Sequence, residues 1–303
     1  MRPERRVGSS RLTSVTAPHR NRIVVAISCL AMLLAACSSG GSASDATPPL
    51  HRTPFDPANF VDPTTSTNPF QPLRPGMQWV REGTTEVGSR AVPHQVITTM
   101  TDVMRTIDGI PTVAMIDQDT DSGQVSQLSI DYFGLDKAGN VWLVGGYTEA
   151  YSGGQFTNTI DAWLGKGPGS EAGILMPAKP KVSTPRWFIQ SNAGDGGSAA
   201  EVVDVGTSRC VPFACYRNVL VVREGKIKAI DNEFKYYAPG VGQIRNSPRK
   251  DSKHKDVEEL VNLVQLSPTG LAERSAEVQR LEAHARKTEP ATFGSAPAST
   301  RAP

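Results

Sequence analysis

The sequence lacks the short motifs that mark common catalytic and cofactor sites. Its 303 residues contain no Gly-x-Ser-x-Gly elbow, no His-Glu-x-x-His pair and no glycine-rich phosphate loop that opens a helix. Only four cysteines are present, and none stands beside a histidine at a zinc-ligand spacing. These absences predict no metal, no cofactor and no assignable catalytic residue, and an enzyme is the less favoured class.

Long apolar stretches are equally scarce, with one exception. The run 23–36 follows a basic segment, but its 14 residues are fewer than the roughly 20 that a spanning helix needs. It ends in Leu34-Ala35-Ala36-Cys37, which resembles a bacterial lipobox. The pattern predicts a lipoprotein signal peptide, residues 1–36, and a diacylglycerol with a further acyl chain such as palmitate on Cys37. An uncleaved membrane anchor is the alternative.

Excess positive charge is also missing once the signal is set aside. The whole chain carries a formal charge of +2, but residues 1–36 hold six arginines and one glutamate, so the remainder is −3. A mildly acidic protein has no electrostatic reason to bind nucleic acid. The predicted location is the extracytoplasmic face of the cell membrane, with the lipid on Cys37 as the membrane contact.

The chain after Cys37 divides by composition into three parts. Residues 37–69 are rich in Ser, Thr, Pro and Gly without periodicity, which predicts a disordered tether. Residues 70–287 are predicted to form one antiparallel β domain that ends in a helix. Residues 288–303 return to Pro, Ala and Thr and are predicted to be a disordered tail.

The central part, residues 70–287, consists mainly of predicted strands separated by glycine-containing turns. Period-two alternation is clearest in 124–133, where Leu128 and Ile130 lie on one face and Ser129 and Asp131 on the other. One face of this strand is therefore expected to be wet, as in an antiparallel sheet. The predicted fold is mainly β, a single curved sheet or partly open barrel with one C-terminal helix; the alternative is a two-sheet sandwich. Further strands are predicted over 77–86, 93–107, 112–116, 141–144, 219–222 and 227–237.

Three segments depart from this pattern. The Gly/Pro-rich residues 165–185 are expected to form a long loop, and residues 193–198 a second one. Residues 245–255 are a polar, mostly basic connection. Residues 257–264 fit a helical face but are rich in β-branched residues, so the sequence allows either a helix or a strand there. After them, Ser267 is predicted to cap a helix with Pro268 at its first position, and apolar residues recur at helical spacing from Leu271.

Few residues are candidates for chemistry. Cys210 and Cys215 are predicted to form a local disulfide that closes a turn, with two free buried thiols as the alternative. Asp117, Asp119 and Asp121 are spaced like calcium ligands, but glycine falls one position late and no bidentate glutamate follows. A solvated hairpin turn is the favoured interpretation.

The histidine and aromatic residues are also explained by ordinary structural roles. His94 lies in a predicted strand without a nucleophile nearby in sequence, and two Ser-x-x-Lys matches at 247–250 and 252–255 lack partner motifs. The aromatics are expected to fill the core, and a ligand pocket lined by them is the less favoured alternative. They are Trp79, Trp142, Trp163, Trp187, Tyr132, Tyr236 and Tyr237.

Several short motifs resemble an uncharacterised family of secreted bacterial proteins. The first is Asn-Pro-Phe-Gln-Pro-Leu-Arg-Pro-Gly at 68–76 with Trp79. The likeness continues at 136–142, 176–182 and 218–220, and in Tyr-Tyr-Ala-Pro-Gly-Val-Gly at 236–242. It covers roughly residues 56–286. The family has no known activity to transfer, and the turn residues in the motifs are typical of a fold rather than of a site.

The sequence alone therefore favours a membrane-anchored extracytoplasmic lipoprotein that binds without catalysis. The expected partner is a small apolar ligand or an envelope protein. An envelope hydrolase with a site assembled from distant residues is the first alternative, and a structural envelope component is the second. A wide apolar cavity would favour a carrier, whereas convergent carboxylates or a His–acid pair would favour an enzyme.

Overall fold

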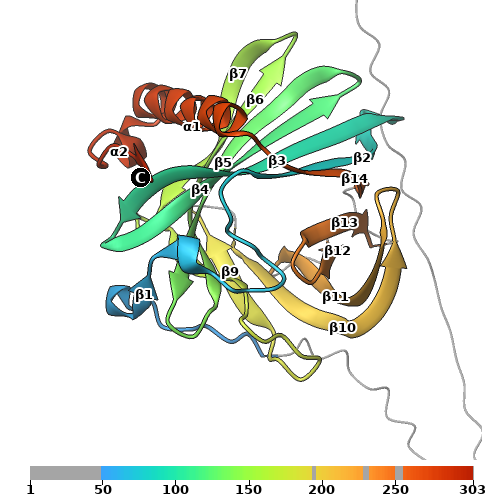
Figure 1. Ribbon diagram of the computed structural model, residues 1–303. Helices are drawn as coiled ribbons and strands as arrows, with labels where there is room; N and C mark the ends of the chain where they lie inside the picture. Colours follow the sequence, from blue (N-terminus) through green and yellow to red (C-terminus); the bar gives the residue numbers. More distant parts are fainter. Residues whose placement is uncertain (1–48, 193–195, 228–231, 250–254, 303) are drawn as a thin grey trace, which may run out of the picture. The chain divides into compact units, whose positions relative to one another are not determined.

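Long strands rich in β-branched and alternating polar residues dominate the structure, a computed structural model. It describes residues 49–192, 196–227, 232–249 and 255–302, all of which belong to one compact unit, residues 47–303. Fifteen antiparallel strands form a single sheet, and twelve of them close into a barrel (Figure 1). The predicted mainly β fold with a C-terminal helix is confirmed, and the sheet closes fully.

Closure follows from the pairings of β5 (Gln124–Asp136). This strand pairs with β4 on one edge and with β6 on the other, so the strand order returns to its start. Closing a sheet removes the exposed edges on which other chains could pair. The twelve barrel strands in spatial order are β5, β4 (Ile110–Asp121), β3 (Arg90–Ile107), β2 (Met77–Val87), β14 (Val257–Gln265), β13 (Gly242–Pro248), β12 (Asn232–Ala238), β11 (Cys215–Lys226), β10 (Ser198–Cys210), β9 (Trp187–Ser191), β8 (Glu171–Met176) and β6 (Val141–Ser152).

Three further strands lie alongside the barrel strands. They are β7 (Gln155–Leu164) on β6, the short β1 (Phe60–Val61) on β5, and β15 (Thr300–Arg301) on β3. Register shifts interrupt several ladders, including β3–β4 between Met100 and Met104. Such bulges bend strands and increase their twist, which a closed barrel requires.

The C-terminal helix α1 (Pro268–Thr288) lies on the outside of the barrel, against β3 and β4 (Figure 1). The side chain of Ser267 accepts the amide hydrogen of Gly270, and Pro268 occupies the first turn, as the sequence predicts. The apolar face of the helix, with Val278 and Leu281, is buried. The helix therefore gives the outer face of the barrel an apolar partner.

Helix α1 reverses the expected orientation of β5. The outward residues Ile130 and Tyr132 are buried, and the Tyr132 hydroxyl donates to Glu282 of α1 at 2.6 Å. Ser129 and Asp131, on the face expected to be wet, point into the barrel instead. The alternation is as predicted, but its polar face lines the interior rather than the outer surface.

The ordered chain begins before the expected end of the tether. Phe60 lies in the hydrophobic core, with its ring centroid 5.3 Å from that of Trp142 on the barrel wall. Two 3-10 helices, η1 (Pro57–Asn59) and η2 (Pro63–Thr65), flank it, each capped by an aspartate side chain. The boundary at residue 69 is thus too late, because proline and threonine here serve helix starts rather than disorder.

The segments that depart from the strand pattern also need correction. The expected loop 165–185 contains β8, and the ambiguous run 257–264 is strand β14. The expected tail carries α2 (Pro290–Phe293) and β15, and Phe293 is fully buried against Tyr147. Part of the connection 245–255 is strand β13. The loop expected over 193–198 lies partly outside the described residues.

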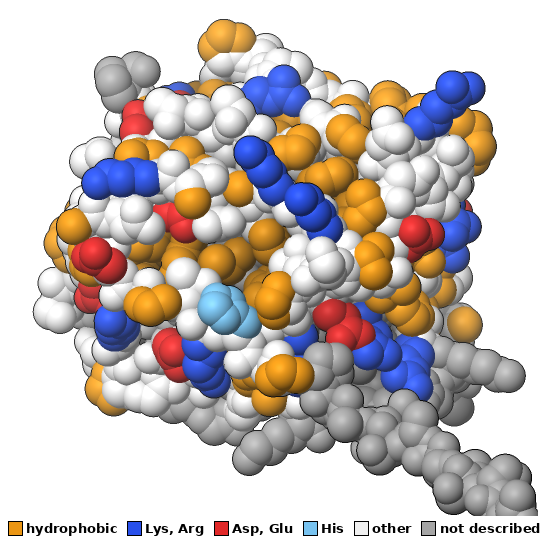
Figure 2. Space-filling view, turned by 90° about the horizontal axis from the view of Figure 1, so that it is seen from below, with side chains coloured by type: hydrophobic (Ala, Val, Ile, Leu, Met, Phe, Trp, Pro, Cys, Tyr) orange, Lys and Arg blue, Asp and Glu red, His pale blue; other side chains and the backbone are white. Residues whose placement is uncertain are grey.

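The described surface carries scattered rather than gathered hydrophobic side chains. The exposed large ones lie on separate elements: the β2–β3 hairpin, β7, the segment after β8, and the hairpin β10–β11. On the face seen from below, hydrophobic side chains alternate with Lys and Arg (Figure 2). None of the described helices combines the length and apolar character needed to cross a membrane.

Candidate functional site

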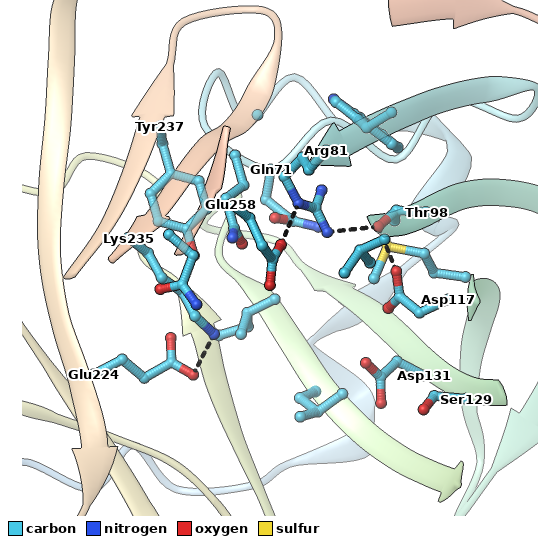
Figure 3. A pocket seen from close by; sticks show the side chains of 18 of the residues that line it. Gln71, Arg81, Thr98, Asp117, Ser129, Asp131, Glu224, Lys235, Tyr237 and Glu258 are labelled. Carbon is cyan, nitrogen blue, oxygen red and sulfur yellow. Dashed lines mark hydrogen bonds and ion pairs between the residues drawn. The ribbon is translucent and has the colours of Figure 1, made fainter. Parts of the chain in front are cut away.

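The barrel encloses a lumen, a cavity of about 400 Å³. Each of the twelve barrel strands contributes at least one lining residue, because alternate side chains of every strand point inward. Asp117, Ser129 and Asp131 lie on one wall, and Glu224 and Lys235 on the wall opposite (Figure 3). The lumen thus brings together residues that are far apart in the sequence.

The lining changes character along the barrel axis. We call the end of the barrel that residues 68–76 cross the base, and the end with the hairpins β2–β3, β4–β5 and β6–β7 the rim. From base to rim, β12 presents Tyr237, Lys235 and Glu233 to the lumen, and β5 presents Phe133 and then Asp131. Aromatic side chains therefore gather at the bottom of the lumen, beside Gln71 and Gln243, and the charged side chains lie on its upper wall.

Negative charge predominates in the lumen. Seven carboxylates line it against two basic side chains. Burying this many charges is unfavourable unless they are paired, protonated or compensated by another molecule. The carboxylates are Asp117, Asp119, Asp131, Glu224, Glu233, Asp256 and Glu258, and the bases are Arg81 and Lys235.

Arg81 is already held by its neighbours. Its Nε donates to Glu258 Oε2 at 2.9 Å, and its Nη2 donates to Thr98 Oγ1 at 2.8 Å. Thr98 in turn donates to Asp117. Burial opposes the charge of Arg81, but Glu258 outweighs it and raises the pKa of the guanidinium. Arg81 therefore stays charged, and its guanidinium is held at the wall by Glu258 and Thr98.

Lys235 is also already paired with acids of the lumen. Its Nζ lies 2.9 Å from Glu224 Oε1 and 3.0 Å from Glu233 Oε1. Burial favours the neutral amine, yet the two carboxylates outweigh it and raise the pKa of Lys235 well above its ordinary value. Both bases of the lumen are thus neutralised by specific acids.

His94 on β3 joins two acids at the lumen wall. Its Nδ1 lies 2.7 Å from Asp121 Oδ1, and its Nε2 lies 3.7 Å from Glu258 Oε1. Burial disfavours the charged ring, but these carboxylates raise the pKa of His94 to about 9. For Glu258, burial would raise the pKa, whereas His94 and Arg81 lower it to about 2. His94 is a charged structural partner of Glu258.

Asp119 and Asp131 differ from the other acids of the lumen. Neither accepts a hydrogen bond or forms an ion pair with any of the described residues, although both line the cavity. Burial, followed by the charges of Asp117 and Glu258, raises the pKa of Asp119 to about 7. Burial, followed by Asp117 and Asp161, raises that of Asp131 to about 8. At neutral pH Asp131 is therefore mostly protonated, and Asp119 is protonated in part.

The structure places the sequence-predicted residues in different regions. Cys210 and Cys215 form a disulfide bond at the turn that joins β10 and β11. Cys37 lies outside the described residues. Asp117 and Asp119 lie within strand β4 and face the lumen, so the solvated-turn interpretation is wrong for them. Among the described residues, no three potential ligands are grouped to hold a metal ion.

Most of the predicted aromatics are core residues, and two contribute to the lumen. Trp79 and Tyr237 line its base, whereas Trp142 and Tyr132 are buried against the outer face of the wall. Trp79 Nε1 donates to the carbonyl of Val241 at 2.6 Å, which fixes its ring. Two of the seven aromatics thus border the cavity while also belonging to the hydrophobic core, and a ligand there stays a prediction.

The motifs of the family resemblance meet at the base. Asn68 Nδ2 donates to the carbonyls of Gly139 and Pro177, and the Gly240 amide donates to the carbonyl of Pro69. Gly242, with a positive φ of 94°, would place a Cβ 3.3 Å from the ring of Pro72. These motifs build the closure of the barrel beneath the lumen, in agreement with their structural interpretation.

Sequence reasoning missed the lumen carboxylates. They come from β4, β5, β11, β12 and β14, and Arg81 and Glu258 are 177 positions apart. The available signal was the row of alternate aspartates in β4, together with Asp131 of the neighbouring strand β5, which pairs with Met115. Because the calcium-loop pattern fails there, the sequence gives this row no chemical assignment.

Comparison with known proteins gives no family. No family model and no curated protein matches the chain. Two solved structures are similar over 66% of it: an inferred exported protein with a YmcC-like fold from Bacteroides fragilis, and an inferred lipoprotein from Parabacteroides distasonis. Identities are 11% and 13%, TM-scores 0.35 and 0.34, and coverage of those chains 99% and 100%.

Proposed function

We propose that this protein is a lipid-anchored, extracytoplasmic barrel that binds a small polar molecule in its lumen. The lipobox pattern around Cys37 supports the anchor, because a cysteine after a short apolar run is the acceptor of a lipid. The lumen supports the binding role. Its wall is polar, so the apolar ligand expected from the sequence gives way to a polar one.

The proposed binding role rests on one observation: the interior of the barrel is charged and is not filled by side chains. Protein interiors are close-packed, and a barrel that served only as a scaffold would gain stability by filling its lumen with apolar side chains. Here about 400 Å³ is left open beside carboxyls without partners, and ligand sites are commonly about 300–1,000 Å³. The open lumen lacks the stability that apolar filling would add, and it leaves a cavity in which a ligand can bind.

A variant with a filled lumen tests this proposal. Ser129→Trp places an indole in the lumen, and Ser152→Trp makes the same change at the exposed end of β6. We expect native mass spectrometry of the protein extracted from membranes to show a bound small molecule in wild-type and Ser152→Trp. The Ser129→Trp variant should lose it.

A second blocking position guards against misfolding. Thr148 pairs with Ser129 across β5 and β6 and also lines the lumen, so Thr148→Tyr should give the same loss. Circular dichroism and thermal unfolding report whether each variant is folded. A bound mass that persists in folded lumen variants contradicts the proposal, as does wild-type protein that stays free after incubation with a small-molecule extract of the envelope. An envelope-protein partner would instead be retained by every variant.

One arrangement favours a second candidate, the envelope hydrolase. Asp131 borders the open lumen and, with a pKa raised to about 8 by burial, has the protonation state of a general acid, while other carboxylates line the same cavity. The same lumen would then act on the bound molecule. Recovery of a chemically altered molecule after incubation, lost in Asp131→Asn, would identify an enzyme, whereas an unaltered one supports binding alone.

A further inference from the structure

Two enclosed carboxyls of the lumen lack the partners that the other acids have. Asp119 and Asp131 project from the adjacent strands β4 and β5 into the cavity, and neither receives a hydrogen bond from the described residues. Their oxygens nevertheless border open space, so another molecule can reach them. This is the arrangement expected of a binding group whose ligand is missing.

Among the described residues, the two basic side chains of the lumen are not available to these carboxyls. Arg81 is bonded to Glu258 and Thr98, and Lys235 lies between Glu224 and Glu233. Moving either base toward Asp119 or Asp131 would leave another buried acid unpaired, which is strongly unfavourable. Among the described residues, no cation is thus left for Asp119 and Asp131, and a positively charged ligand is the candidate partner.

The rest of the cavity indicates what carries that charge. Its volume is that of an organic molecule rather than of a bare ion. Beneath the acidic wall, the base of the lumen presents Trp79, Phe133 and Tyr237 together with aliphatic side chains such as Leu143. Aromatic faces and aliphatic groups suit the carbon part of a ligand, and aromatic faces also attract ammonium groups.

We propose that the lumen binds an organic amine, with its ammonium groups at Asp119 and Asp131 and its carbon part in the open cavity that these carboxyls border. This inference rests on the proposed function and specifies its ligand class. Asp119 and Asp131 are the residues that determine specificity. The amine makes the hydrogen bonds and supplies the charge that both carboxyls lack.

Proton release accompanies such binding. The charged groups that face Asp131 are Asp117, Asp161, Lys235 and Glu224; those that face Asp119 are Asp117, Glu258, His94 and Arg81. With the cations already paired, Asp131 is mostly protonated and Asp119 partly protonated near neutral pH, and an ammonium ion must displace these protons. Affinity for an amine should therefore rise from pH 6 to pH 9, while the amine itself remains charged.

A matched ligand series provides the test. Isothermal titration of full-length protein in lipid nanodiscs compares 1,5-diaminopentane with 1,5-pentanediol and glutarate, which keep the chain and change the charge. We expect binding of the diamine only, and a loss of affinity of about tenfold or more in Asp131→Asn and in Asp119→Asn. Glu86→Gln, an exposed acid at the β2–β3 hairpin, is the control and should bind as wild-type.

The outcomes separate this inference from the proposed function. Equal binding of the diol, or diamine affinity unchanged by both Asp→Asn substitutions or by pH, overturns the amine. So does binding of Mg²⁺ or Ca²⁺ with the same dependence on Asp131. If the diamine fails while Ser129→Trp still abolishes a mass bound in native spectra, lumen binding stands and only the ligand class is wrong. Diamine binding that survives in folded Ser129→Trp overturns both.

Discussion

Glu258 and Asp131 are carboxyls in one lumen whose pKa values are driven in opposite directions. Glu258 has cationic neighbours in Arg81 and His94, so it ionises at low pH despite its burial. Asp131 has acidic neighbours and no bonded cation among the described residues, so burial dominates. The difference comes from the partner that each strand position supplies, because the burial of both favours the neutral form.

A prediction at the residue scale follows for Asp131. A carboxyl whose pKa is raised by folding stabilises the protein below its unfolded value near 4, and this contribution is lost as the pH rises through about 8. Asp131→Asn keeps the shape without the ionisation. We expect its unfolding free energy relative to wild-type to increase from pH 4.5 to pH 8.5, by up to about 4 kcal/mol.

Urea denaturation at the two pH values measures this change. The exposed Glu86→Gln variant is the control, and its difference from wild-type should not vary in the same way. A stability difference for Asp131→Asn that is the same at both pH values would show that the Asp131 carboxyl has an ordinary pKa.

At the scale of elements, helix α1 covers the apolar face of the neighbouring strands from outside the barrel. Arg105 on β3 has a fully buried side chain, and its Nη1 donates to Glu282 Oε1 at 3.0 Å. Tyr132 on β5 donates to the same oxygen. One carboxylate of the helix thus satisfies groups on two barrel strands, and it fixes the helix on the wall.

Glu282→Ala should therefore destabilise the protein. Removing one partner leaves Arg105 buried without its counter-charge, which costs about 3–5 kcal/mol. Glu273→Ala, an exposed acid on the same helix, is the matched control and should change stability by less than about 0.5 kcal/mol. Chemical denaturation of both variants measures the difference; equal effects would show that the ion pair does not hold the helix. The double variant Arg105→Met, Glu282→Leu should recover stability, because it removes both charges.

The assignments at this scale also show the limits of periodicity. Period-two patterns located β2, β3 and β5, and the Ser267-Pro268 cap located α1. The run that forms β14 fits a helical face as well as a strand, and its pairing with β2 decided the outcome. The segment 165–185 looked like a loop because its glycines and prolines surround only six strand residues, Glu171–Met176. Short strands between turns carry too little pattern to be recognised alone.

At the scale of the whole molecule, Cys37 should determine where the barrel resides. Cys37→Ala removes the thiol that accepts the lipid, and we expect the protein to move from the membrane fraction to the soluble fraction. Cys29→Ala is the matched control, because Cys29 lies inside the apolar run and its loss leaves the lipobox intact. Immunoblots of fractionated cells measure both. Retention of Cys37→Ala in the membrane would favour an uncleaved anchor and contradict the lipobox interpretation.

The sequence by itself determined the local features of this protein. Alternation specified strands, glycine turns specified hairpins and Ser267 specified the start of the helix, while the apolar run before Cys37 predicts a signal. Each of these depends on residues a few positions apart, whose physical preferences act without the rest of the chain.

Only the tertiary structure decided which face of each strand turns inward. An alternating strand has two faces, and the sequence does not say that a helix will cover the apolar one from outside. Closure then placed Asp119, Asp131, Lys235 and Glu258 around one cavity, although they come from strands at both ends of the chain. Their pKa values and their pairing follow from that proximity. The candidate site exists because the barrel closes.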